Sequence, residues 1–280
     1  MVNYNGQLLE KDSFYLNGNN RGFLYGDALF ENLRVINRKV IFWEDHYLRL
    51  MSSMRVLRME IPMSFTMEFL EEEILKLTLN DSDENPTRIR ITIFRNNGGY
   101  YKPEINEISY VIESEFLADS YYILNEGSYE VELFKDFTLS KNMLSNLKTT
   151  NRILNVVGSI YASENGYENC LLLNDSKSVT EALDGNIFLV KDNILKTPPL
   201  EDGCIKGIVR KKILEIVKNI KTYEFQEKSI SPFELQQADE LFIANSIKGI
   251  QPISKYRKKT FSSIVAKDIL GKLNAAARLN

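Results

Sequence analysis

Residues 171–210 read LLLNDSKSVTEALDGNIFLVKDNILKTPPLEDGCIKGIVR. The apolar runs of this stretch are short, and turn-forming residues such as Asp, Ser, Gly and Asn separate them, which is typical of successive β-strands. A Pro-Pro pair and Gly203 then mark a loop, and Gly207 opens a helix that we expect to run to about Ile220. The stretch therefore predicts a segment of sheet followed by a helix.

In the rest of the chain, the spacing of apolar residues likewise indicates both helices and strands. Periodicity predicts a hairpin turn at 5–6, helices over 44–58, 64–79 and 151–164, and strands over 88–95, 109–114 and 240–244. Residues 27–36 fit a helix and a strand equally well, and residues 96–106 form a loop long enough to suggest a function. Residues 115–127 have little pattern, so we place a domain boundary near residue 120 and expect an α+β protein with domains 1–120 and 121–280.

Composition limits the chemistry that this chain can perform. It has 280 residues, one histidine (His46) and two cysteines (Cys170 and Cys204). A metal site with several histidines or four cysteines is impossible, so no metal is predicted, and a nucleophilic triad would need His46. With 35 basic and 38 acidic residues, the net charge of −3 gives no basic footprint for nucleic acid. No apolar run reaches about 18 residues, so we expect no membrane span and a cytoplasmic location.

Two side chains in the second half could carry catalysis. Lys148, in the segment LKTTNRILNVV, is either a solvated lysine near a helix start or an amine that becomes nucleophilic once burial removes its proton. Glu181, which precedes a strand, is either a turn carboxylate or the partner of a protonated ring nitrogen. Neither residue is decisive alone.

Two further features are candidate anion sites. The helix that Gly207 opens presents the backbone N–H groups of Ile208 and Val209 together with partial positive charge, although it is also an ordinary helix entry. After the strand ELFIA, the Ser246 hydroxyl and the neighbouring amides, Ile247 included, could hold a phosphate. The order of all four features along the chain is more informative than any one of them.

In that order the motifs resemble the fold-type IV family of pyridoxal-phosphate enzymes, which includes branched-chain aminotransferases, D-amino acid aminotransferases and 4-amino-4-deoxychorismate lyases. The segments that carry the resemblance are RGFLYGDALFENLRV (21–35), HYLRL (46–50), KTTNRILNVV (148–157), the stretch 171–210 and ELFIANSIKGIQPI (240–253). The resemblance implies a two-domain α+β fold with a small N-terminal α/β domain and a larger C-terminal pseudo-barrel domain. It also implies pyridoxal 5'-phosphate as cofactor, an amino acid and a 2-oxo acid as substrates, and a homodimer.

The resemblance also implies roles for individual residues. Lys148 would hold the cofactor as a Schiff base and move the proton at the substrate Cα, and Glu181 would keep the cofactor ring nitrogen protonated. The phosphate would be bound by Arg49, by the backbone N–H groups of Ile208 and Val209 and by the Ser246 hydroxyl. Relatives often have threonine at position 209, so the valine keeps an amide donor but loses a hydroxyl. The residues implied for substrate binding are Tyr25, Phe30, Arg90, Arg95 and Ile247, while His46 is expected to be a structural neighbour of Arg49.

The motifs do not agree on whether the reaction is transamination or lyase chemistry. Glu31 resembles the aminotransferases, and Arg90 matches an arginine of the branched-chain enzymes. Against these, Arg152 replaces the tyrosine typical of the branched-chain enzymes, whereas the loop after Arg95 lacks the second arginine that is common in the lyases. We therefore expect a branched-chain-like aminotransferase of class IV. The alternative is a 4-amino-4-deoxychorismate lyase that makes 4-aminobenzoate and pyruvate.

Overall fold

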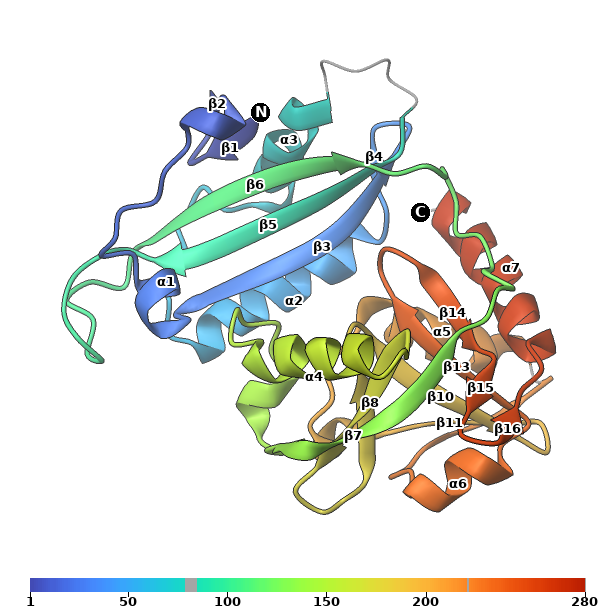
Figure 1. The fold of residues 1–280 in the computed structure, drawn as a ribbon. Coiled ribbons are helices and arrows are strands. Elements are labelled where there is room, and N and C mark those ends of the chain that lie inside the picture. The colour runs from blue at the N-terminus through green and yellow to red at the C-terminus, as the bar shows by residue number, and fades with distance from the viewer. Residues whose placement is uncertain (79–84, 221, 280) are drawn as a thin grey trace. The chain divides into compact units, whose positions relative to one another are not determined.

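A computed structural model describes residues 1–78, 85–220 and 222–279, and these form two compact units (Figure 1). Unit 1 contains Met1–Tyr121 and Lys148–Asn151, and unit 2 contains Tyr122–Leu147 and Arg152–Asn280. The break after Tyr121 is one residue from the boundary expected from the sequence. The return of 148–151 to unit 1 was not expected, because no local pattern marks it.

Unit 1 is built on one antiparallel six-stranded sheet with the strand order β2-β1-β6-β5-β3-β4. The strands are β1 (Val2–Tyr4), β2 (Gln7–Leu9), β3 (Ala28–Ile36), β4 (Lys39–Val40), β5 (Thr87–Arg95) and β6 (Ile108–Phe116). The helices are α1 (Arg21–Tyr25), α2 (Trp43–Val56) and α3 (Met67–Leu75), with 3-10 turns η1 (Lys11–Ser13) and η2 (Lys76–Thr78). In Figure 1, α2 runs behind the sheet and covers one of its faces.

Strand β3 resolves the ambiguity of residues 27–36. Eight of its residues pair with β5, from Ala28 opposite Phe94 to Val35 opposite Thr87. This long-range pairing, which no local pattern reveals, selects the strand over the helix. Near the start of β3 a second segment joins it, because the Phe30 N–H donates to the Lys148 carbonyl at 2.9 Å.

The predicted helices and strands of unit 1 are confirmed, with one shift. The second helix begins at Met67, not at residue 64, because the Thr66 side chain accepts a hydrogen bond from the Phe69 N–H at 3.2 Å and so caps it. The part of this helix expected beyond residue 78 lies outside the described residues. The hairpin turn is also confirmed, since Asn5 and Gly6 have the positive φ values of 49° and 89° that a tight β-turn uses.

Unit 2 contains two five-stranded sheets, β12-β11-β10-β13-β14 and β16-β15-β7-β8-β9. The strands are β7 (Glu130–Leu139), β8 (Asn169–Asn174), β9 (Val179–Ala182), β10 (Asn186–Lys191), β11 (Ile194–Thr197), β12 (Glu224–Glu227), β13 (Glu240–Asn245), β14 (Gly249–Ile253), β15 (Lys255–Tyr256) and β16 (Lys259–Thr260). The helices are α4 (Ile153–Glu164), α5 (Ile208–Ile220), α6 (Pro232–Gln237) and α7 (Ile264–Leu279), with 3-10 turns η3 (Met143–Asn146) and η4 (Leu200–Asp202). The sequence predicted α4, α5 and β13 at nearly these positions, and the successive strands expected within 171–210 are confirmed by β9, β10 and β11.

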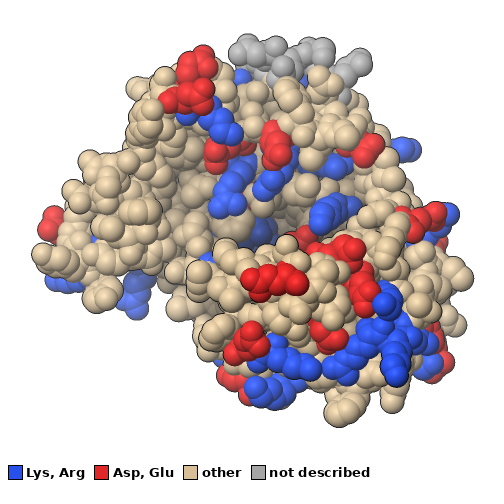
Figure 2. All heavy atoms as spheres, in the orientation of Figure 1, with Lys and Arg blue, Asp and Glu red and all other residues tan. Residues whose placement is uncertain are grey.

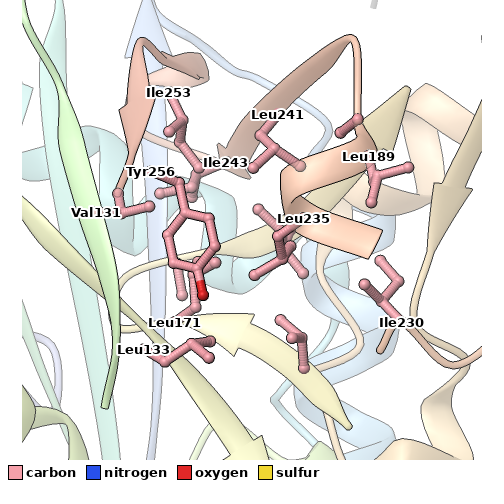
Figure 3. Packing of buried hydrophobic residues seen from close by; sticks show 14 of the residues in the cluster. Val131, Leu133, Leu171, Leu189, Ile230, Leu235, Leu241, Ile243, Ile253 and Tyr256 are labelled. Atoms are coloured by element: carbon pink, nitrogen blue, oxygen red, sulfur yellow. The ribbon is translucent and has the colours of Figure 1, made fainter. Parts of the chain in front are cut away.

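The core of unit 2 lies between its two sheets (Figure 3). Leu133 and Leu171 enter it from one sheet, and Leu189 and Leu241 enter it from the other. Tyr256 is completely buried among them, and this burial raises its pKa to about 12. Because two sheets enclose one apolar core, the barrel-like α+β architecture expected for the C-terminal domain is confirmed.

Among the described residues, none of the helices combines the length and the apolar character needed to cross a lipid bilayer.

Candidate active site

Lys148 is positioned by strand β3 of unit 1. Besides the bond to Phe30, the Thr150 N–H donates to the Ala28 carbonyl at 3.1 Å, so the backbone on both sides of Thr149 is fixed. The Lys148 Nζ lies 4.3 Å from the centroid of the Phe30 ring. The sequence placed this lysine near the start of a helix predicted over 151–164, and the helix begins at Ile153. The amine is therefore carried by a short extended segment bound to a sheet.

Arg90 contacts the same aromatic ring. Its Cζ lies 4.0 Å from the Phe30 centroid, and its Nε donates to the Thr92 Oγ1 at 3.2 Å. Burial lowers the pKa of Arg90, and Glu113 opposes this change, but a guanidinium remains charged at neutral pH. The structure thus brings together three residues that the sequence proposed separately, namely Lys148, Phe30 and Arg90.

Glu31, His46 and Arg49 form a buried ionic cluster on the opposite, helix-covered face of the sheet. The Arg49 Nε and Nη2 donate to the two oxygens of Glu31 at 2.7 and 2.5 Å, and the His46 Nδ1 lies 2.7 Å from the Glu31 Oε2. Glu31 is 1% exposed. Burial raises the pKa of this carboxyl, but the charge of Arg49 and the hydrogen bond from His46 outweigh it and lower the pKa to about 2.

His46 contributes to this cluster as an orienting group. Burial lowers its pKa below 6.5, although Glu31 opposes the change, so the imidazole is neutral at pH 7. Its Nδ1–H is then assigned as the donor to Glu31. The guanidinium of Arg49 has five N–H donors, and the pair with Glu31 uses two of them. The cluster therefore gives Arg49 a fixed orientation, as an anion-binding arginine requires.

Glu181 is a buried acidic residue of unit 2. It lies on β9, is 2% exposed, and its Oε2 accepts a hydrogen bond from the Ile205 N–H at 2.8 Å. Burial lowers the pKa of Arg152, and the nearby Glu181 partly opposes this change. Cys204, next to Ile205, is no nucleophile, because burial and Glu181 raise the pKa of its thiol to about 12.

The loop that holds Glu181 leads directly into helix α5. The Asn186 Nδ2 donates to the Ile205 carbonyl at 2.9 Å, and a Cβ on Gly207 would lie only 2.0 Å from the Asn186 Oδ1. Glycine is thus required where the loop turns into the helix. In an α-helix that begins at Ile208, the N–H groups of Ile208 and Val209 have no carbonyl partner within the helix and can bind an anion.

Ser246 lies in a turn between β13 and β14 that its neighbours hold closed. The Asn245 Oδ1 accepts hydrogen bonds from the N–H groups of Ile247 (3.0 Å) and Lys248 (2.8 Å). The Tyr122 hydroxyl donates to the Ser246 carbonyl at 3.2 Å. The amide of Ile247, which the resemblance implied for substrate binding, is therefore used inside the turn. The Ser246 hydroxyl stays a candidate phosphate ligand.

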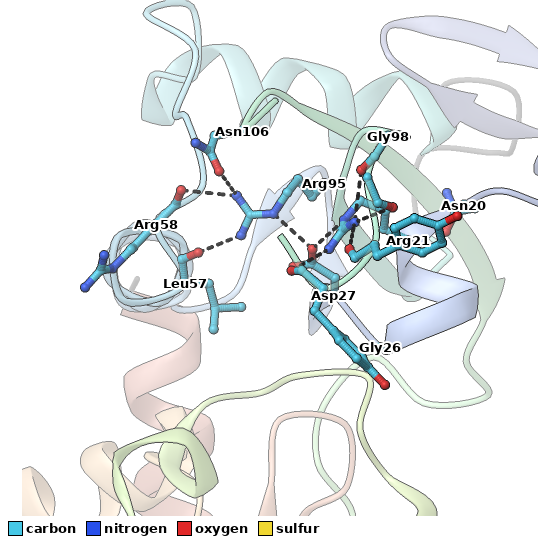
Figure 4. Close-up of polar contacts among 12 residues, drawn as sticks. Asn20, Arg21, Gly26, Asp27, Leu57, Arg58, Arg95, Gly98 and Asn106 are labelled. Carbon is cyan, nitrogen blue, oxygen red and sulfur yellow. Dashed lines mark hydrogen bonds and ion pairs between the residues drawn. The ribbon is translucent and has the colours of Figure 1, made fainter. Parts of the chain in front are cut away.

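Arg95 belongs to a separate network at the end of the unit 1 sheet (Figure 4), which also contains Arg21, and the Arg21 Cζ lies 5.0 Å from the centroid of the Tyr25 ring. Asp27 Oδ2 accepts hydrogen bonds from the Nε atoms of both Arg95 and Arg21, each at 2.9 Å. Arg95 also donates to the Asn106 side chain and to two carbonyls, while Arg21 donates to carbonyls of the loop from Gly98 to Tyr101. These contacts favour a structural role for Arg95. The sequence did not predict the roles of Arg21 and Asp27 in this network. The only signal for them was the presence of two charged residues in a motif with two glycines.

The chain belongs to the class IV aminotransferase family. The pattern described as "Amino-transferase class IV" matches residues 28–256, which include Glu31, Lys148, Glu181 and the Ser246 turn. Family membership implies the cofactor pyridoxal 5'-phosphate. The resemblance predicted from the motifs is thus confirmed.

Three curated relatives illustrate the range of this family. A putative branched-chain-amino-acid aminotransferase of Methanocaldococcus jannaschii is 27% identical and covers 96% of this chain and 92% of its own. A D-alanine aminotransferase of Bacillus licheniformis is 23% identical, with coverages of 94% and 90%. An aminodeoxychorismate lyase of Vibrio harveyi is 27% identical, with coverages of 84% and 84%. The relatives indicate a class IV enzyme and do not fix its reaction.

The fold agrees with a solved structure of the family. The branched-chain aminotransferase of Thermoproteus uzoniensis, solved with norvaline, superimposes with a TM-score of 0.87 at 23% identity and covers 97% of this chain and 92% of its own. At this identity the likeness concerns the fold alone.

The residues present fit the cofactor that the family implies. In unit 2, the hydrogen bond from Ile205 to Glu181 brings a buried carboxyl group beside the loop that begins α5, so a carboxyl group for a ring nitrogen and N–H donors for a phosphate are brought together from two segments that are separated in the sequence. In unit 1, an arginine with an oriented guanidinium and a lysine against an aromatic ring supply the remaining groups. Each donor type matches one part of pyridoxal 5'-phosphate.

Proposed function

We propose that the protein is a branched-chain-like class IV aminotransferase that moves an amino group between an amino acid and a 2-oxo acid. The observation that carries this proposal is the shared contact of Lys148 and Arg90 with the Phe30 ring, at 4.3 and 4.0 Å. An amine that moves a proton at Cα and a guanidinium that binds a carboxylate are what an amino acid or a 2-oxo acid requires. Arg90 is accordingly proposed to bind a substrate carboxylate.

The other residues would hold the cofactor. Pyridoxal 5'-phosphate supplies an electron sink when it is bound. The carboxylate of Glu181 would keep a proton on the ring nitrogen, and Arg49 would bind the phosphate with the orientation that Glu31 gives it. The N–H groups of Ile208 and Val209 and the Ser246 hydroxyl would add neutral donors. Val209 is expected to bind through its amide alone, since its side chain has no hydroxyl.

The lyase alternative has one observation in its favour. Arg88 lies two residues before Arg90 on the same face of β5, and Arg34 is directly opposite Arg88 on β3. Figure 2 shows Lys and Arg side chains gathered over β3 and β5. Two arginines spaced about 7 Å apart along a strand suit a substrate with two carboxylates, as aminodeoxychorismate is.

We also propose a homodimer located in the cytoplasm. Helix α4 exposes an apolar stripe at helical spacing, with Ile153, Val156 and Ile160 exposed to 74%, 52% and 52%. Such a stripe on a helix surface is typical of a contact between chains. Light scattering of the purified protein tests the dimer, and a monomer at micromolar concentration would contradict it.

A panel assay decides between the two reactions. The purified protein, loaded with pyridoxal 5'-phosphate, is incubated with branched-chain, aromatic and D-amino acids and 2-oxoglutarate, and separately with aminodeoxychorismate. We expect glutamate to form with a branched-chain amino acid. Formation of 4-aminobenzoate without any glutamate would establish the lyase instead.

A further inference from the structure

Two turns of unit 2 meet at one end of the β10–β13 strand pair. Because Asn186 is paired with Ala244, the turn that enters β10 and the turn that leaves β13 lie at the same edge (Figure 1). The packing there is close, since a Cβ on Gly185 would lie 2.6 Å from the Ala244 carbonyl oxygen. The first turn follows Glu181, and the second contains Ser246.

Asp184 accepts hydrogen bonds through three atoms, and two of these atoms join the two turns. Its backbone carbonyl accepts a hydrogen bond from the Asn245 Nδ2 at 3.1 Å, and its Oδ2 pairs with the Lys248 Nζ at 3.0 Å. Its Oδ1 accepts a hydrogen bond from the buried Asn169 at 2.8 Å. Burial lowers the pKa of Lys248, but Asp184 outweighs it and raises the pKa, so the Lys248 ammonium stays charged at neutral pH.

The contacts with Asp184 fix both ends of the Ser246 turn. Asn245 precedes Ser246 and uses its Nδ2 for Asp184 while its Oδ1 closes the turn. Lys248 ends the turn and is bound through its ammonium. A serine between two anchored residues has a restricted backbone, which lowers the conformational entropy that is lost when its hydroxyl binds an anion.

We propose that Asp184 is a positioning residue that holds the Ser246 turn in the conformation that binds the phosphate of the cofactor. This inference rests on the proposed role of Ser246 in cofactor binding. Asp184 acts through Asn245 and Lys248 and does not contact the phosphate itself. The same contacts fix the distance between the turn that follows Glu181 and the Ser246 turn, so the residues that would bind the ring nitrogen and the phosphate would share one support.

The opposite end of the same strand pair provides a matched control. There the Asp239 carboxylate pairs with the Lys191 Nζ at 3.1 Å and accepts a hydrogen bond from the Asp192 N–H at 2.9 Å. The Asp239–Lys191 pair is 48% and 47% exposed, against 40% and 49% for the Asp184–Lys248 pair. Both pairs thus join β10 to β13 with similar exposure, but only one of them touches the Ser246 turn.

The test compares Asp184→Asn with Asp239→Asn as apoproteins, titrated with pyridoxal 5'-phosphate and with pyridoxal, which has no phosphate. We expect Asp184→Asn to raise the Kd of pyridoxal 5'-phosphate about fivefold and to leave that of pyridoxal unchanged. Lys248→Met, which removes the same ion pair from the other side, is expected to act alike. Asp239→Asn should change neither constant. Melting temperatures of the apoproteins show that all the variants are folded.

Two results would overturn the inference while the wild-type protein still binds the cofactor. One is an equal Kd for Asp184→Asn and Asp239→Asn, and the other is an equal loss of affinity for both compounds, which would indicate a general effect on the fold. A wild-type protein that binds neither compound would contradict the proposed function itself, so the two failures are distinguishable.

Discussion

Glu31 and Arg49 form a two-point ion pair inside unit 1, with N–O distances of 2.7 and 2.5 Å and with Glu31 almost completely buried. The chain uses a carboxylate of β3 to orient an arginine of α2, and His46 adds a third contact from the same helix. An arginine oriented in this way loses little side-chain entropy when it binds an anion. The only histidine of the chain thus contacts the carboxylate that orients Arg49.

Replacing Glu31 by Gln is expected to destabilise the protein strongly. Removal of one partner from a buried pair leaves the other charge uncompensated, which costs about 3–5 kcal/mol. Urea denaturation of the apoprotein measures this loss. The control is Glu115→Gln, because Glu115 pairs with Arg88 at 2.8 Å but is 68% exposed, and such a pair contributes about 1 kcal/mol or less. Equal losses for the two variants would show that Glu31 does not anchor Arg49.

The stability of the protein is expected to fall as the pH decreases below 6.5. The pKa of His46 is lowered in the folded state, so the unfolded chain binds the proton first, and the native state loses stability as the pH falls through this range. The lowered pKa of Glu31 adds a second loss as the pH falls from 4.5 toward 2. The single histidine gives one set of imidazole signals in an NMR titration. A midpoint above 6.5 would contradict the assignment.

Replacing Asp27 by Asn is expected to loosen the loop from residue 96 to residue 106. Asp27 is the shared acceptor of two buried guanidinium groups, those of Arg21 and Arg95 (Figure 4). Its loss leaves both without their anion, at a cost of about 3 kcal/mol or more. Limited proteolysis should then cut near Tyr100 and Tyr101, which are 85% and 90% exposed. A cleavage pattern like that of the wild type would show that the network does not hold this loop.

Arg90 and Arg88 are expected to respond differently to substitution. Loss of the charged hydrogen bond to a substrate carboxylate corresponds to about a 10- to 100-fold decrease in kcat/KM for Arg90→Gln. Arg88→Gln should change kcat/KM by less than about threefold for a monocarboxylic amino acid. Steady-state kinetics with leucine as donor measures both effects. Similar values for Arg90→Gln and the wild type would exclude Arg90 from carboxylate binding.

The sequence was most informative where a motif is continuous. Each of the residues Lys148, Glu181 and Gly207 belongs to an uninterrupted segment. The helix after Gly207 begins at the expected residue, because a glycine at a helix start is a local signal. The class IV family was recognised from such segments, and the matching residues confirm it.

Long-range contacts are what the sequence could not reveal. Lys148 belongs to unit 1 because its carbonyl accepts a hydrogen bond from Phe30, 118 positions earlier in the numbering. The pairing of Arg95 with Asp27 joins residues 68 positions apart, and Asn245 reaches Asp184 across 61 positions. The period of a strand or helix carries no information about such partners. The role of Glu31 was visible only as a likeness to aminotransferases.

The identity of the lysine that carries the cofactor tests the central claim most directly. The protein is loaded with pyridoxal 5'-phosphate, reduced with borohydride, digested and mapped by mass spectrometry. A Schiff base between the cofactor and a lysine absorbs visible light, and we expect this absorbance band to disappear on reduction. We also expect the cofactor mass to appear on the peptide that contains Lys148. The cofactor on another lysine, or no covalent label at all, would contradict the account.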